Sequence, residues 1–185
     1  ASPGNDHRLG ANEAPPAIIS MFLGEQLTDI LEQIEACGEA KCKPASTMQL
    51  GARSLPSWAK DTTDRNRTSP FAFTGNKFEF RMVGSMQSIA GANFVLNTIV
   101  AESLSQFADR LEKASVVKDA VKAIITETVK KHKRVIFNGN NYSEEWVAEA
   151  EKRGLPNIRS TVEAIGAIKA EKNLKVMEKH GVLSR

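Results

Sequence analysis

One stretch, Asp64–Val83 (DRNRTSPFAFTGNKFEFRMV), restricts the possible folds more than any other part of the chain. Near its end, charged and apolar residues alternate: Lys77, Glu79 and Arg81 are separated by phenylalanines and followed by a methionine. Because successive side chains of a strand point to opposite faces, the three charged residues share one face and the apolar residues share the other. The stretch therefore predicts a strand with one buried face and one charged face.

The charged face allows two interpretations. In the simpler one, opposite charges pair with one another on a solvated strand face. In the other, the carboxylate of Glu79 binds a metal ion, and the cations bind carboxylate or phosphate oxygens, for which arginine forks are well shaped. Two more arginines, Arg65 and Arg67, lie just upstream. Alternation alone favours the simpler interpretation.

Helical periodicity predicts most of the remaining structure. A helix is expected from Ala17 to about Cys37, after the tolerated prolines Pro15 and Pro16, and a long loop is expected over Gly38–Thr63. Further helices are expected at about Asn93–Glu112, Val116–Lys133, around Trp146, and from Ser160 to near Gly181. The apolar stripes expected to be buried in the two long helices consist of Phe94, Val95, Ile99, Val100, Leu104, Phe107 and Leu111, and of Val117, Val121, Ile124, Ile125 and Val129.

The C-terminal part is expected to pack within the chain as a helical bundle with a shared core of Phe137, Trp146 and Val162, and to have a secondary part in subunit assembly. Ser143 and Ser160 are expected to cap helices, and Asn138–Asn141 (NGNN) is expected to be a turn. Removing residues 114–185 is expected to expose the stripe of the Asn93–Glu112 helix and to leave every candidate site residue in place.

Composition excludes several classes of protein. The chain has 185 residues, enough for one domain with a core, or for a domain and a helical appendage. A net charge of +3 does not indicate nucleic-acid binding, and no apolar run approaches the roughly 20 residues of a membrane span. Cys37 and Cys42 lack the spacing and the histidine neighbours of a zinc site. Free thiols and the absence of a signal peptide predict a cytoplasmic protein.

Two motifs resemble those of a known family. The segments Gly4–Ile18 (GNDHRLGANEAPPAI) and Asp64–Ser85 (DRNRTSPFAFTGNKFEFRMVGS) are similar to glutamine synthetases, specifically to the long type III branch. The resemblance is strongest over Gly4–Leu104 and continues more weakly into the helical tail. It implies an α+β fragment of the glutamine synthetase catalytic domain, with antiparallel strands and helices, followed by a mostly helical C-terminal extension.

The resemblance implies the reaction and its participants. Glutamine synthetases ligate ammonia to glutamate through a γ-glutamyl phosphate made from ATP, with Mg²⁺ or Mn²⁺ between nucleotide and substrate. The chemistry needs cations for carboxylates and a phosphoryl group, carboxylates for metal, and a base for ammonium. The implied partners are glutamate, ammonia, ATP, the rest of the synthetase chain and further copies in a homo-oligomeric ring, with neither nucleic acid nor a membrane.

Matching the motifs position by position assigns roles to six residues. Arg8 resembles the arginine that holds the substrate α-carboxylate, and Glu13 resembles the flap glutamate that takes a proton from ammonium and closes the site. Arg67 resembles the arginine that steadies the transferring phosphate. On the strand, Glu79 matches a ligand of the metal nearer ATP, and Arg81 matches the arginine at the γ-carboxylate and phosphate. The sixth, Lys77, is implied to contact the nucleotide.

Three departures from shorter synthetases favour the type III branch. Lys77 replaces an arginine and cannot make the same bidentate contact. Pro70-Phe71-Ala72 replaces a segment with another phosphate-binding arginine, and the loop from Arg8 to Glu13 is one residue shorter.

The resemblance also implies that the chain begins within the catalytic domain. Residues 1–113 would be the C-terminal portion of that domain and residues 114–185 a helical extension, so the chain alone is expected to be inactive. Two alternatives remain: a γ-glutamyl-amine or polyamine ligase of the same fold, and a non-catalytic helical interaction module.

Overall fold

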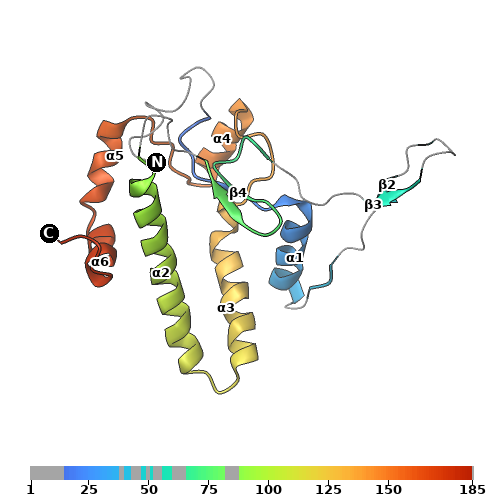
Figure 1. Ribbon diagram of the computed structural model, residues 1–185, viewed down its shortest axis with the longest axis horizontal. Helices are drawn as coiled ribbons and strands as arrows, with labels where there is room; N and C mark the ends of the chain where they lie inside the picture. Colours follow the sequence, from blue (N-terminus) through green and yellow to red (C-terminus); the bar gives the residue numbers. More distant parts are fainter. Residues whose placement is uncertain are drawn as a thin grey trace.

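The structure, a computed structural model, describes residues 15–37, 40–42, 47–48, 51, 56–59, 66–81 and 88–184. Within these ranges the chain forms a small mixed sheet, a separate two-stranded hairpin and a set of helices (Figure 1). The expected α+β class is confirmed. No helix in this part of the chain combines the length and the apolar character that a membrane crossing requires.

The small sheet has the strand order β1-β4-β5. Strand β1 (Met21–Phe22) pairs in parallel with β4 (Phe71–Phe73), and β4 pairs antiparallel with β5 (Phe78–Phe80). The predicted strand at β5 is therefore confirmed. The other pair, β2 (Thr47–Met48) and β3 (Trp58–Ala59), forms an antiparallel hairpin that projects away from the helices (Figure 1).

The first helix begins later than its periodicity predicts. Helix α1 spans Gly24–Cys37, and the preceding residues 15–23 are not helical and include β1. Gly24 has a φ of +78°, a conformation that favours glycine. The side-chain oxygen of Asn138 accepts hydrogen bonds from the backbone N–H groups of Leu23 and Gly24, each at 3.1 Å. A contact from a distant segment therefore sets the start of α1. The expected end of this helix at Cys37 is confirmed.

Two long helices run side by side in opposite directions (Figure 1). Helix α2 spans Ala90–Glu112 and α3 spans Val117–His132, followed by the 3₁₀ turn η2 (Lys133–Val135). Helix α1 packs against α3, and Lys133 of η2 forms a 2.7 Å ion pair with Glu35 of α1. Both long helices were predicted within a few residues of their bounds.

The prediction that their apolar stripes are buried is wrong for most positions. Thr98 is buried in α2 and Ile124 in α3. The exposed members of the predicted stripes are Phe94, Val95, Ile99, Val100, Leu104, Val117, Val121 and Ile125. Helix α2 packs on α3 and on α6, and these neighbours leave the side that carries most of its stripe open.

Three shorter helices complete the chain. Helix α4 spans Glu144–Lys152, with the Ser143 hydroxyl accepting the N–H of Trp146 at 3.2 Å, which confirms the predicted cap. The prediction of a single final helix from Ser160 is wrong. The structure has two helices there, α5 (Thr161–Ile168) and α6 (Glu171–Lys179), separated by the extended residue Ala170. Ser160 caps α5 as predicted, through the N–H of Glu163.

The core joins the two ends of the chain. Ile18, from the segment before β1, packs with Trp146, Ala150 and Leu155. The ring of Phe137 stacks on Trp146 with centroids 3.8 Å apart. The predicted contribution of Phe137 and Trp146 is confirmed. The prediction for Val162 is wrong, because this residue of α5 is 81% exposed. The C-terminal part thus packs on the N-terminal part as well as on itself.

Candidate active site

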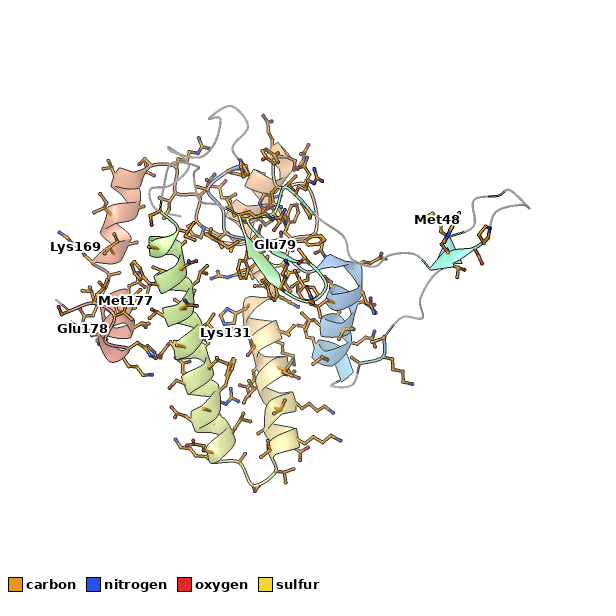
Figure 2. The ribbon with its side chains drawn as sticks, in the orientation of Figure 1. Met48, Glu79, Lys131, Lys169, Met177 and Glu178 are labelled. Carbon is orange, nitrogen blue, oxygen red and sulfur yellow. The ribbon has the colours of Figure 1, made fainter. Side chains whose placement is uncertain are left out.

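The charged row lies on and beside β5, as predicted from the alternation. Glu79 lies between two cations: its Oε1 is 3.8 Å from Lys77 Nζ, and its Oε2 is 3.8 Å from Arg81 Nε. Both separations are longer than a charge-assisted hydrogen bond. The Lys77 side chain is 66% exposed and that of Glu79 is 38% exposed. Figure 2 shows Glu79 on the small sheet, well away from the hairpin that carries Met48.

The opposite face of this sheet is aromatic. Phe71 stacks on Phe78 with ring centroids 5.2 Å apart and meets Phe80 edge to face at 6.2 Å. Phe73 lies 5.2 Å from Phe78. Ala72 pairs with Glu79 and so lies on the same face as Glu79, where it is fully buried, whereas Phe78 on the aromatic face is 44% exposed. Because this packing fixes the strand, the three charged side chains are held on the other side.

The guanidinium of Arg81 is hydrogen-bonded at Nη2 and carries a buried, unbonded donor at Nε. Its Nη2 donates to the backbone carbonyl of Asn66 at 2.6 Å, and its backbone N–H bonds the carbonyl of Pro70 at 2.8 Å. Its Nε is buried, with no hydrogen-bond acceptor in the part of the chain that the structure describes. A buried donor without an acceptor costs free energy, so this atom suits a ligand oxygen near Glu79.

Arg67 is exposed at the tip of a tight turn. Its two neighbours are bonded to each other: the side-chain oxygen of Asn66 accepts hydrogen bonds from the backbone N–H of Thr68, at 3.0 Å, and from the Thr68 hydroxyl, at 2.6 Å. This is an Asx turn, the local structure that asparagine favours. The turn and Arg81 share Asn66, so the two arginines are held by one short segment.

A second turn, Asn138–Asn141, contacts this segment from the C-terminal part of the chain. Asn66 Nδ2 donates to the carbonyl of Gly139 at 2.9 Å, and the Thr68 hydroxyl accepts the N–H of Asn141 at 3.0 Å. The C-terminal part therefore lies directly beside the segment that carries Arg67. Sequence reasoning identified the NGNN turn but not its contacts, because no local pattern indicates a partner more than 70 residues away.

The other predicted site residues divide into two groups. Arg67, Lys77, Glu79 and Arg81 lie within the described ranges, where Glu79 contacts Lys77 and Arg81. Arg8 and Glu13, and with them the flap, lie outside these ranges. Among the residues with described positions, no group of three or more His, Cys, Asp or Glu side chains could hold a metal ion.

Comparisons with known proteins show which proteins this chain resembles. Residues 120–185 match the family model of the glutamine synthetase C-terminal domain. The whole chain is 49% identical to the type-3 glutamine synthetase of Dictyostelium discoideum, of which it covers 25%. It is 41% identical over its whole length to a glutamine synthetase of Butyrivibrio fibrisolvens, covering 26% of it. Over 89% of the chain it is 47% identical to a glutamine synthetase of Bacteroides fragilis, covering 24% of that protein.

The chain thus spans about a quarter of the length of the curated relatives it matches. The match to the type-3 enzyme spans both motif segments, and the family-model match covers the helical tail over residues 120–185. The resemblance inferred from the two motifs is therefore confirmed: over its whole length, this chain is similar to the type III branch of the glutamine synthetases.

Proposed function

We propose that this chain is part of an enzyme that ligates ammonia to glutamate at the expense of ATP. The observation that carries the proposal is the grouping of Glu79, Arg81 and the Arg67 turn in a chain that is 49% identical over its whole length to a type-3 glutamine synthetase. A carboxylate beside an arginine with a buried, unbonded donor suits a phosphate and the metal that accompanies it. The 185 residues alone would not catalyse.

In the proposed reaction, a γ-carboxylate oxygen of glutamate attacks the γ-phosphorus of ATP, and the bond to ADP breaks. Ammonia then attacks the γ-carbon of the resulting γ-glutamyl phosphate, and inorganic phosphate leaves. Arg67 and Arg81 would stabilise the negative charge of the transferring phosphoryl group. Arg81 would also hold the γ-carboxylate during the first step.

Glu79 would hold one divalent cation, Mg²⁺ or Mn²⁺. Its half-exposed carboxylate fits this role, because Mg²⁺ is commonly bound by one or two carboxylates together with substrate phosphates. When bound, the ion would neutralise phosphate charge. Lys77, the most exposed of the three side chains, would contact the nucleotide as a point charge.

The roles of Arg8 and Glu13 rest on the motif alone. Arg8 would bind the substrate α-carboxylate, and Glu13 would accept a proton from ammonium so that free ammonia can attack. The complete enzyme would be a cytoplasmic homo-oligomeric ring. In it, residues 1–113 would belong to the catalytic domain and residues 114–185 would form a C-terminal extension.

The test is a substrate comparison with the full protein that contains this chain. Purified protein is supplied with glutamate, ATP and Mg²⁺, and with ammonia, a monoamine or a polyamine as the nitrogen donor. Glutamine formed in equal amounts with ADP and phosphate, and preferred turnover of ammonia, would support the proposal. Preferred turnover of an amine would indicate a γ-glutamyl-amine ligase. No turnover with any donor would favour a non-catalytic module.

A further inference from the structure

We propose that the turn Asn138–Asn141 positions the phosphate-binding arginines Arg67 and Arg81. This inference rests on the proposed function, because it assumes that these two side chains hold the transferring phosphate. It assigns a role in the reaction to a part of the chain outside both of the motifs that resemble the synthetases.

The first step of the argument is the set of hydrogen bonds between the two turns. Gly139 accepts from the Asn66 side chain at 2.9 Å, and Asn141 donates its backbone N–H to the Thr68 hydroxyl at 3.0 Å. The Asn141 side-chain amide lies 3.4 Å from the same hydroxyl. The residues on both sides of Arg67 are therefore tied to the distant turn.

The second step is that the turn is itself rigidly held. Asn141 is 1% exposed, and its side-chain oxygen accepts the hydroxyl of the equally buried Ser20 at 2.7 Å. Asn138 binds the two backbone N–H groups at the start of α1 and donates to the Thr28 hydroxyl at 2.9 Å. The backbone before the turn also joins the sheet edge, where Phe137 N–H bonds the carbonyl of Met21 at 2.9 Å.

The third step is the close packing at Gly139. A Cβ atom there would lie 2.6 Å from the ring of Phe137. That ring is stacked on the buried Trp146 with centroids 3.8 Å apart, so it cannot move aside freely. Only glycine brings the carbonyl at this position to Asn66 without displacing the ring.

The fourth step links the turn to the arginines. Asn66, which the turn holds through its side chain, is the residue whose carbonyl accepts from Arg81 Nη2 at 2.6 Å. The Arg67 side chain is exposed and extends from the same turn, so the backbone of the turn sets where it begins. A displacement of the Asn66–Thr68 backbone would therefore move both guanidinium groups. Displacements of about 1 Å can cost about 100-fold in rate.

The test compares four variants of the full protein in the glutamine synthesis assay. Asn141→Ala and Thr68→Val each remove contacts between the turns, whereas Thr68→Ser keeps the hydroxyl. The matched control is Asn157→Ala, which removes a similar bond from the C-terminal part to the N–H of Ala17 at 3.1 Å but touches neither turn. Activity is measured well below the melting temperature of every variant, so that each is fully folded.

We expect kcat to fall about tenfold or more in Asn141→Ala and Thr68→Val, with the KM for glutamate changed less than about twofold. Thr68→Ser should recover most of the loss, and Asn157→Ala should keep the kcat of the unmodified protein even if it melts earlier. Equal losses of kcat in Asn141→Ala and Asn157→Ala would mean that the turn only stabilises the fold, and would overturn the proposal. An unchanged kcat in Asn141→Ala would do the same.

A structural measurement separates this inference from the proposed function. If the unmodified protein makes no glutamine, the proposed function fails, and a structure of the Asn141→Ala protein then decides the inference. Displacement of Arg67 and of the Arg81 guanidinium relative to α1 and α4 would support positioning by the turn. An undisplaced pair of arginines would refute it.

Discussion

Glu79 lies between two cations, but neither forms a short hydrogen bond to its carboxylate. Its two oxygens each lie 3.8 Å from a cation, too far for the short bonds of a closed ion pair. An ionised carboxylate offers about four lone-pair sites, so it can bind a metal ion while keeping both neighbours. Alternation alone favoured charges that simply pair on a solvated face, and the motif resemblance favoured ligand binding. The unbonded Arg81 Nε is compatible with the proposed ligand.

At this scale we predict the effect of Glu79→Gln in the full protein. The substitution keeps the shape of the side chain but removes a negative charge from a divalent-metal site, so kcat should fall at least about 100-fold. Part of the activity should return at high Mn²⁺. Glutamine formation is measured while Mg²⁺ or Mn²⁺ is titrated.

The matched control for this variant is Glu149→Gln on α4. Glu149 bonds Arg153 one helical turn away at 2.8 Å, and it belongs to none of the proposed contacts with substrate or metal. The Glu149→Gln substitution should leave kcat and the metal dependence of glutamine formation unchanged. If Glu79→Gln also retained normal turnover at every metal concentration, Glu79 would not be a ligand.

Among the elements, two helix caps set by local chemistry were predicted correctly, whereas a helix start set by a distant contact was not. Ser143 and Ser160 satisfy N–H groups within their own helices, and Gly154 adopts the positive φ of +67° expected after a helix end. The start of α1, in contrast, depends on Asn138, more than a hundred residues away.

The site shows the same division between local and distant information. Alternation along one strand placed Lys77, Glu79 and Arg81 on one face, because strand geometry is local. The turn that supports Arg67 could not be predicted, because its partners lie in another part of the chain. The same limit applies to the stripe of α2: its period was recognisable, but the elements that would cover it are a property of the assembled fold.

The packing of α4 supports a stability prediction. Trp146 is 1% exposed, stacks on Phe137 and lies beneath the guanidinium of Arg153, 5.5 Å from the ring centroid. Trp146→Ala should lower the free energy of unfolding by about 3–5 kcal/mol, as expected for a large buried side chain. Chemical denaturation of the full protein, followed on the transition that includes α4, measures the change.

The second tryptophan of the chain provides the control. Trp58, on the β2–β3 hairpin, is 46% exposed, so Trp58→Ala should change the free energy of unfolding by less than about 1 kcal/mol. Similar losses for the two variants would show that Trp146 does not occupy the principal core of this region.

The contact between α2 and α6 should depend on pH. Glu102 of α2 accepts from Lys179 Nζ at 2.7 Å and lies 2.8 Å from His180 Nε2, and these bonds, with one from Gln106, lower the pKa of Glu102 from 4.5 to about 2. A carboxylate with a lowered pKa stabilises the folded state above its unfolded pKa. This contribution is lost as pH falls from 4.5 to about 2.

The measurement is the difference in melting temperature between the unmodified protein and Glu102→Gln. We expect a difference above pH 4.5 that shrinks steadily towards pH 2. Glu145→Gln, at an exposed position of α4, controls for the general effect of removing a carboxylate. A difference that stayed constant over this range would contradict the role of the Glu102 contact.

For the whole molecule, the main finding is that the proposed active site depends on both ends of the chain. The core unites Ile18 with Trp146, a single backbone bridge joins Met21 to Ile136, and the Arg67 turn is bonded to Gly139. In contrast, α5 and α6 lie beside α2, on the side away from α1, as Figure 1 shows. Figure 2 likewise places Lys169, Met177 and Glu178 far from Glu79. Different parts of the C-terminal region should therefore contribute differently to activity.

Two deletions in the full protein separate these contributions. Deleting residues 160–185 removes α5, α6 and the bonds to Glu102 but keeps the turn Asn138–Asn141. This truncation should melt earlier and keep most of its kcat, because every contact of the Arg67 turn remains.

Deleting residues 114–185 removes α3, α4 and the turn as well. It should lower kcat about tenfold or more in whatever fraction remains folded, and it should uncover Ile18 and the inner side of α2, reducing soluble yield. Thermal unfolding, yield and glutamine synthesis are measured on both. A protein lacking residues 114–185 that melted normally and kept its full kcat would show that the C-terminal region is an independent appendage, and the support of the Arg67 turn from that region would then have no part in catalysis.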